Sequence, residues 1–88
     1  MDQDKLLIDI LRQRVIELMN EKGIKTVKEL ERRSDVPDST LAHFLAGETK
    51  DIRFSHVVRL AQGFSLTPAE LLDTEAFNKY ERKENNNE

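Results

Sequence analysis

With 88 residues and no cysteine, the chain has room for one small domain, and it excludes a disulfide framework and a thiolate zinc site. The net charge of −3 excludes a uniformly basic surface, although the acidic excess lies at the two ends and the central segment 23–50 has equal numbers of acidic and basic residues. We therefore expect weak non-specific affinity for nucleic acid, with a shallow dependence on salt. No apolar run approaches the roughly 20 residues of a membrane span, so we expect no contact with a membrane.

Residues 3–22 predict one long amphipathic helix. Leu7, Leu11 and Val15 recur at a spacing of four, and Gly23 suits the end of the helix. The first turns carry more apolar residues than one face can present to a core, namely Leu6, Leu7, Ile8 and Ile10. These residues either cover a C-terminal helix of the same chain or form a dimer contact.

The stretch Thr26 to Gly47 predicts two short helices joined by a tight turn. The first begins with the capping box Thr26-Val27-Lys28-Glu29, in which the hydroxyl and the carboxylate each satisfy an N–H group of the first turn. Ser34-Asp35 interrupts the helix because both side chains bond the local backbone. Pro37 suits the first turn of the second helix, and Gly47 suits its C-terminal end. The buried sides are formed by Val27 and Leu30 in the first helix, and by Leu41, Phe44 and Leu45 in the second.

A polar loop follows Gly47 and leads to a predicted helix that ends near Gln62. We expect Asp51 or a neighbour to cap this helix and Gly63 to break it. The stretch Thr67-Pro68-Ala69-Glu70 is a second capping box, with proline at the first helical position, and it predicts a further helix.

The C-terminal residues divide into two parts. Residues 74–80 are candidates to continue the last helix, so that Phe77 and Tyr80 would cover the apolar start of the first helix. Residues 81–88 have no apolar side chain, and we expect them to be disordered.

The stretch 26–47 resembles the helix-turn-helix of the phage-repressor family, also described as Cro and lambda-repressor-like, or XRE. With Val27 at the first position of the motif, the apolar positions and the final glycine are matched by Leu30, Val36, Leu41, Phe44 and Gly47. Three positions depart from the family pattern. Val27 replaces a glutamine that often bonds a phosphate, Glu31 replaces a small residue between the helices, and Asp35 replaces the glycine of the turn. Asp enters the left-handed region more readily than most residues.

The run LAQGFSLTPAELL, residues 60–72, is similar to a second pattern of the same family. The resemblance covers Leu11 to Asp73, and it implies an all-α, five-helix lambda-repressor-like DNA-binding domain with an extended first helix. We expect residues 1–10 to extend helix 1. We expect residues 11–73 to form the helix-turn-helix domain, with its motif at 26–47, and residues 74–88 to form a C-terminal tail.

In this family the second helix of the motif enters a major groove. The residues that point away from its apolar side are the candidates for contact with bases: Pro37, Asp38, Ser39, Ala42 and His43. Ser39 and His43 can hydrogen-bond to a base edge or a phosphate. Asp38 can accept from cytosine N4, and Ala42 can contact a thymine methyl group. Alternatively, Asp38 stabilises the helix N-terminus, Ser39 supports the first turn, and His43 is an exposed residue without a role.

The family places the start of the first motif helix, and the loop after the second, against phosphates. The matching residues are Lys25, Thr26, Val27, Lys28, Thr49, Lys50 and Arg53. Backbone N–H groups at Thr26 and Val27 add donors at a helix N-terminus. The alternative for each lysine is an ordinary solvated charge.

Catalytic and metal-binding patterns are missing from the sequence. His43 and His56 stand apart from other ligand types, and neither a glycine-rich phosphate loop nor a nucleophile motif is present. We therefore expect no enzyme activity, no metal and no cofactor. The lack of cysteine fits a cytoplasmic location.

The resemblance implies a sequence-specific DNA-binding transcriptional regulator, a repressor that acts as a homodimer on a two-fold operator in double-stranded DNA. The dimer candidates are Leu6, Leu7, Ile10, Phe77 and Tyr80. The alternative is a protein-interaction module on the same fold, such as an antitoxin, an anti-repressor or an accessory subunit, with a protein partner and little DNA binding. The outward face favours this alternative because it lacks Arg, Lys, Gln and Asn, whereas Lys25, Lys28 and Lys50 favour DNA.

Overall fold

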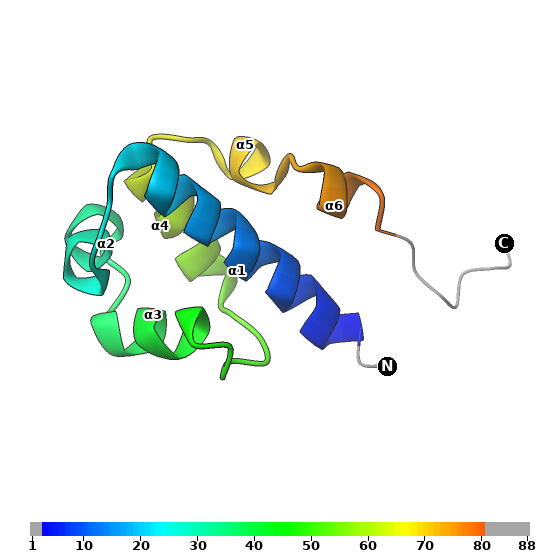
Figure 1. Cartoon of the computed structure of the whole chain (residues 1–88), viewed down its shortest axis with the longest axis horizontal. Helices are drawn as coiled ribbons and strands as arrows, with labels where there is room; N and C mark the ends of the chain where they lie inside the picture. Colours follow the sequence, from blue (N-terminus) through cyan, green and yellow to red (C-terminus); the bar gives the residue numbers. More distant parts are fainter. Residues whose placement is uncertain (1–2, 81–88) are drawn as a thin grey trace, which may run out of the picture.

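The computed structural model describes residues 3–80, and all regular secondary structure in this range is helical (Figure 1). The helices are α1 (Gln3–Lys22), α2 (Val27–Ser34), α3 (Asp38–Leu45), α4 (Phe54–Gly63), α5 (Pro68–Leu72) and α6 (Glu75–Asn78). The predicted all-α class with an extended first helix is confirmed. A membrane-spanning helix is absent from residues 3–80, since none combines the length and the apolar character that crossing requires. Residues 81–88, for which the sequence predicts disorder, lie outside the described range.

The longest helix, α1, runs through the middle of the molecule. Figure 1 shows α5 and α6 along one side of α1 and α3 along the other, and α1 contacts all three. Its buried side chains recur at three or four residues, the spacing that keeps them on one helix face, and they are Ile8, Leu11, Val15 and Leu18. Gly23 follows with a φ of 73°, a left-handed conformation that ends the helix and that strains any residue with a Cβ.

One continuous core joins the helices. Its largest fully buried side chains come from α2, α3, α4, α5 and the residue just after α4, and they are Leu30, Leu41, Phe44, Leu60, Phe64 and Leu71. Burial of each such side chain contributes about 1.5–3 kcal/mol relative to leaving it exposed. The core holds α3 by its inner side, which leaves the opposite side of this helix in solvent.

Two helix starts follow from the local sequence. At α5, the Thr67 hydroxyl accepts the N–H of Glu70 at 3.1 Å, and the Glu70 carboxylate accepts the N–H of Thr67 at 2.9 Å, which completes the predicted capping box. At α2, the Thr26 hydroxyl accepts the N–H of Glu29 at 3.1 Å, as predicted. The Glu29 carboxylate instead pairs with Arg33 of the same helix at 3.3 Å. An ion pair thus replaces half of the first capping box.

The predicted cap of α4 is wrong. The helix begins at Phe54, and its N-cap residue, Arg53, makes no side-chain capping bond. Asp51 accepts the N–H of Ile52 at 2.8 Å within the preceding loop. An N-cap side chain reaches the second or third helical residue, so Asp51 lies too early in the chain to cap a helix that starts at Phe54.

Gly63 was predicted to break α4, but it is the last residue of that helix. A Cβ at this position would lie 2.9 Å from the Cα of Ser34, a contact that real Cβ atoms essentially never make. Glycine is needed here because α4 crosses α2 at close range. The chain turns away from α4 two residues later, at Ser65, whose φ of 62° is left-handed.

The segment 74–80 forms the separate helix α6 and does not extend α5. Arg14 of α1 donates from Nε to the carbonyl of Leu71 at 2.8 Å and from Nη2 to the carbonyl of Glu70 at 2.9 Å, so these α5 carbonyls already have partners. A new helix then starts with Thr74 as its cap, and α6 packs on α1. A side chain far away in sequence therefore binds the carbonyls at the end of α5.

Candidate nucleic-acid interface

The turn between α2 and α3 is held by hydrogen bonds. Asp35 has a φ of 63°, and its N–H donates to the carbonyl of Glu31 at 2.7 Å. The buried Ser34 hydroxyl donates to the carbonyl of Leu30 at 2.7 Å and accepts the N–H of Val36 at 3.3 Å. Asp35 therefore adopts the left-handed conformation expected of the turn glycine, and the bonded turn sets the direction in which α3 leaves α2.

Opposite its buried side, α3 presents a face to solvent. Four of the five candidates for base contact are exposed and one, Asp38, is half-buried; the five are Pro37, Asp38, Ser39, Ala42 and His43. Pro37 is the N-cap residue, with φ and ψ of −56° and 142°, and so stands just before the first turn of the helix. The structure thus brings the five residues together on or next to one helix, and their contact with bases stays a prediction.

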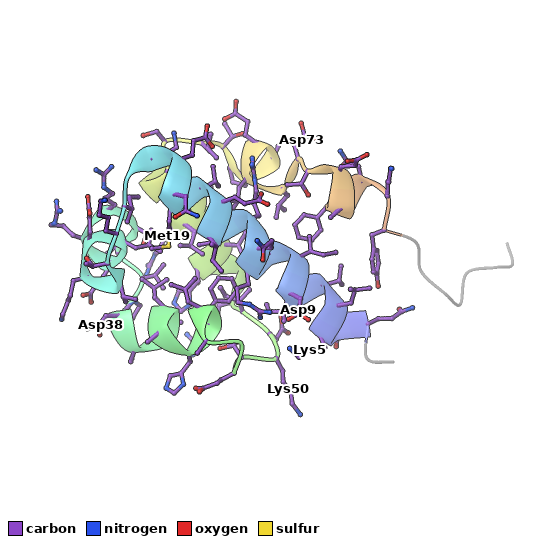
Figure 2. The ribbon with its side chains drawn as sticks, viewed as in Figure 1. Lys5, Asp9, Met19, Asp38, Lys50 and Asp73 are labelled. Atoms are coloured by element: carbon purple, nitrogen blue, oxygen red, sulfur yellow. The ribbon has the colours of Figure 1, made fainter. Side chains whose placement is uncertain are left out.

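An ion pair between α2 and α3 uses two of the predicted DNA-contacting residues. Lys28 Nζ lies 2.8 Å from a carboxylate oxygen of Asp38 and 3.9 Å from one of Glu31. The Glu31 carboxylate also accepts the backbone N–H of Asp38 at 3.3 Å, at the start of α3. Figure 2 shows Asp38 at the end of α3 that lies next to α2. Glu31, which departs from the small residue of the family motif, thus connects the two helices.

This ion pair shifts two pKa values in the directions that keep both groups charged. The hydrogen bond and the positive charge of Lys28 hold the pKa of Asp38 below its ordinary 3.8. The hydrogen bond and charge of Asp38, with a smaller effect of Glu31, raise the pKa of Lys28 above 10.5. The two opposite charges cancel in part, so Lys28 attracts a phosphate less strongly than an unpaired lysine would.

At the other end of α3, His43 is also engaged. Its Nδ1 lies 2.7 Å from a carboxylate oxygen of Glu48, and both side chains are exposed. Because a carboxylate only accepts, Nδ1 carries the proton of this bond, and Nε2 is the ring atom that remains for a base or a phosphate. The sequence alone contained this pair at a spacing of five residues, but its distance depends on the path of the loop after α3.

Three basic residues near α3 have no ion-pair partner among residues 3–80, namely Lys25, Lys50 and Arg53. All three are exposed. Lys25 precedes α2, and Lys50 lies in the loop after α3, where Figure 2 shows its side chain extending into solvent. Of the other phosphate candidates, Thr26 is exposed, and Val27 and Thr49 are half-buried. Unpaired positive charge therefore lies just before α2 and in the loop after α3.

Arg12 of α1 lies near α3, although no motif in the sequence points to it. Arg12 of α1 pairs with Asp9 at 2.8 Å, and a Cβ on Gly47 would lie 3.5 Å from Arg12 Nη1. The guanidinium therefore lies against the C-terminal end of α3, where a cation offsets the helix dipole. Only the packing of α1 on α3 reveals this role.

The five predicted dimer residues do not form one exposed patch. Leu6 is 38% exposed and the other four are half-buried. Leu7 and Phe77 line a groove between α1, α6 and the start of α4, whereas Ile10 lines a different hollow beside Thr74. The packing of α6 on α1 agrees with the alternative that the apolar start of the first helix is covered by the same chain. The set comprises Leu6, Leu7, Ile10, Phe77 and Tyr80, and its place in a dimer stays a prediction.

A family model, the Cro/C1-type HTH DNA-binding domain, matches residues 14–76. The match begins within α1, includes α2, the turn and α3, and ends within α6. No curated protein and no solved structure was found to match the chain.

Proposed function

Because the chain belongs to the Cro/C1-type helix-turn-helix DNA-binding family, we propose that it is a sequence-specific transcriptional repressor that binds a two-fold operator as a homodimer. The family match supports a DNA-binding regulator. The observation that carries the proposal is the outer face of α3, which lies in solvent, together with two unpaired lysines, Lys25 before α2 and Lys50 in the loop after α3.

In this mechanism α3 enters the major groove, which is wide enough to admit a helix. Lys25 and Lys50 contact phosphates on either side of the groove and set the position of the helix without reading sequence. The backbone N–H groups in the first turn of α2, at Val27 and Lys28, add donors toward a phosphate at a helix N-terminus. Thr26 supports them because its hydroxyl caps the same turn.

The side chains of α3 offer limited direct readout. Ser39 can donate or accept at a base edge, Ala42 can pack on a thymine methyl group, and His43 can use Nε2. Asp38 remains tied to Lys28, which restricts its approach to cytosine N4. Bidentate contacts, worth roughly 1–3 kcal/mol of discrimination each, need side chains that this face does not offer. One subunit therefore reads few bases, and specificity requires a second subunit.

A two-fold dimer would place two α3 helices in successive major grooves about 34 Å apart, the spacing of half-sites in helix-turn-helix operators. Two bound subunits would cover a promoter and exclude polymerase by steric hindrance. Any inducing signal would then act through a partner or through the dimer contact.

A specific observation favours a second candidate, a protein-interaction module such as an antitoxin, an anti-repressor or an accessory subunit. An ion pair of Lys28 with Asp38 and a hydrogen bond of His43 with Glu48 already engage polar side chains of the outer face of α3. Phosphates would have to compete with the carboxylates for the basic groups of this face. A polar protein surface could bind the face without breaking these internal contacts. Under this reading the chain would bind DNA weakly.

Fluorescence anisotropy separates the two candidates. A labelled duplex from the region upstream of the protein's own coding sequence is compared with a scrambled duplex of equal composition, across a salt series. The repressor proposal expects tight binding to the first duplex alone, with two chains bound for each operator. Equal and weak binding to both duplexes, lost at moderate salt, would overturn it and favour the protein-interaction module.

Lys50→Glu tests the phosphate contact directly. We expect binding to weaken on every duplex, with the magnitude of the salt slope reduced by about one, because a phosphate contact carries no sequence information. Lys79→Glu, just after α6, is the control for the charge change because it lies away from α3, although Lys79 also pairs with Glu75 at 2.9 Å. Equal effects of the two substitutions would remove the α3–α4 loop from the interface.

A further inference from the structure

The most exposed large apolar side chain in residues 3–80 is Phe54, the first residue of α4. It is 78% exposed, compared with 38% for Leu6 and 39% for Leu72. The family motif does not account for it, and Phe54 makes no part of the buried core. A single exposed ring is ordinary, but an exposed ring that borders further apolar surface marks a contact for another molecule.

Phe54 stands at the edge of an apolar groove of about 320 Å³. The groove lies where the start of α4 meets α1 and α6, and its apolar lining includes Leu7, Leu11, Ile52, Val57 and Phe77. A closed cavity of about 150 Å³ is enough to hold benzene, so the groove has room for an aromatic ring. The same patch therefore carries both a protruding ring and a hollow that can receive one.

We propose that this groove is the surface on which a second copy of the chain docks, with Phe54 of each copy entering the groove of the other. The proposal rests on the homodimer proposed above and names the surface that forms it. A two-fold contact is isologous, so its surface must be complementary to itself. A ring beside a groove on one patch meets that requirement, whereas a partner without a matching ring would leave the groove unfilled.

Charge supports the same occupant. Asp4 and Asp51 contribute carboxylates to the groove, and Arg53 stands next to Phe54 without an ion-pair partner among residues 3–80. When Phe54 of one copy enters the groove of the other, Arg53 comes close to the acidic edge of that groove, and the same contact repeats by symmetry. Arg53, a phosphate candidate by resemblance, is thereby assigned to the dimer contact.

The position of the groove suits an operator-binding dimer. Asp51, Ile52 and Phe54 lie in and just after the loop that leaves the C-terminal end of α3, and Figure 1 shows this loop extending from α3 toward the N-terminal half of α1. A two-fold axis beside this loop would bring the C-terminal ends of both α3 helices toward each other. The outer faces of α3 would stay clear of the contact.

The first test measures mass by sedimentation equilibrium of the full chain without DNA, at tens to hundreds of micromolar. Wild type should be a dimer, and Phe54→Asp should weaken self-association by roughly tenfold or more, as expected for a central aromatic residue. Leu72→Asp on α5 is the matched control and should leave the dimer intact. Circular dichroism should show unchanged helix content in Phe54→Asp, because Phe54 is outside the core. A monomeric wild type, or an unchanged dimer in Phe54→Asp, would overturn the proposal.

The second test uses charge reversal. Arg53→Glu alone and Asp51→Arg alone should each weaken self-association, because like charges then meet twice across the two-fold axis. An equal mixture of the two variants should restore it, since both contacts become attractive again. A mixture that stays monomeric would overturn the pairing of Arg53 with the acidic edge.

These measurements contain no DNA, so they test the proposed dimer surface separately from the proposed binding to an operator. A dimer that dissociates in Phe54→Asp but binds no operator would retain this surface and overturn the repressor proposal alone. Operator binding by a wild type that is monomeric without DNA would overturn this surface and leave the DNA-binding function standing.

Discussion

Helix α2 meets its two neighbours in opposite ways. Against α4 the contact is steric, because the backbone of Ser34 comes so close to Gly63 that no Cβ fits between them. Against α3 the outer part of the contact is electrostatic, since Lys28 and Glu31 hold the start of α3 through Asp38. The first contact leaves no room for a side chain at Gly63 unless the helices shift, and the second can be altered by pH, salt or a nearby phosphate. The adjustable contact lies on the side proposed to face DNA.

The largest expected effect comes from filling the close contact between α2 and α4. Gly63→Ala should destabilise the fold by about 2–3 kcal/mol in urea unfolding, because overpacking forces the two helices apart. Gly23→Ala is the matched control. Its φ of 73° strains alanine by about 1 kcal/mol, but no atom lies within 4 Å of the added Cβ. A smaller loss for Gly63→Ala than for Gly23→Ala would contradict the steric account.

The turn between α2 and α3 should give the next largest effect. Asp35→Val places a β-branched residue at a φ of 63°, and we expect unfolding free energy to fall by about 1–2 kcal/mol. Asp35→Gly should change it by no more than about 0.5 kcal/mol, because glycine adopts this conformation without strain. Chemical denaturation of both variants measures the difference. Similar values for valine and glycine would mean that the Asp35 side chain, and not its backbone, holds the turn.

Breaking the ion pair between α2 and α3 should change DNA binding more than stability. Asp38→Asn removes the charge that holds Lys28, so Lys28 becomes available to a phosphate. We expect several-fold tighter binding to a scrambled duplex and a salt slope larger in magnitude by about one. The unfolding midpoint should change little, because exposed ion pairs contribute little to stability. Unchanged affinity for the scrambled duplex would show that Lys28 does not reach a phosphate.

The smallest effect is the pH dependence of the same pair. The folded-state pKa of Asp38 lies below 3.8, so its contribution is present above 3.8 and is lost as pH falls through the lower folded value. The pKa of Lys28 lies above 10.5, so its contribution is lost only as pH rises beyond that value. Asp38→Asn should therefore make the acid-side decrease in the urea midpoint slightly shallower. The pKa of Asp9 is also lowered, mainly by its hydrogen bond to Lys5. Asp9 therefore contributes the same acid-side loss of stability to wild type and to Asp38→Asn. An identical decrease in the two proteins would rule out a contribution from Asp38.

Much of the fold could be predicted because its signals are local. The capping box at Thr67 and Glu70 is complete within four residues, and the left-handed turn depends on the conformational tolerance of Asp35 and on the hydrogen bonds of its neighbour Ser34. The apolar spacing of α1 indicated which side of the helix is buried. The sequence wrongly predicted a cap of α4 at Asp51. An acidic residue in a loop can bond the local backbone as readily as it caps the next helix.

The candidate site was predicted as a set of positions, but its chemistry was not. The exposed positions of α3 followed from helical spacing, as did the basic residues around it. The partners of Asp38 and His43 did not, because Lys28 lies on another helix and Glu48 lies in a loop whose path depends on packing. The sequence therefore identified which side chains are available and overestimated how many of them are unengaged.

By itself, then, the sequence of this protein determined the helices, the turn and the family, since each depends on residues within a few positions of one another. The tertiary structure decided how the helices end and meet. Arg14 bonds a carbonyl 57 positions away, and the backbone of Ser34 leaves room only for a glycine in α4. It also decided that Phe54 lies outside the core beside a groove. These features depend on distances between segments remote in the chain, which are set only when the core packs.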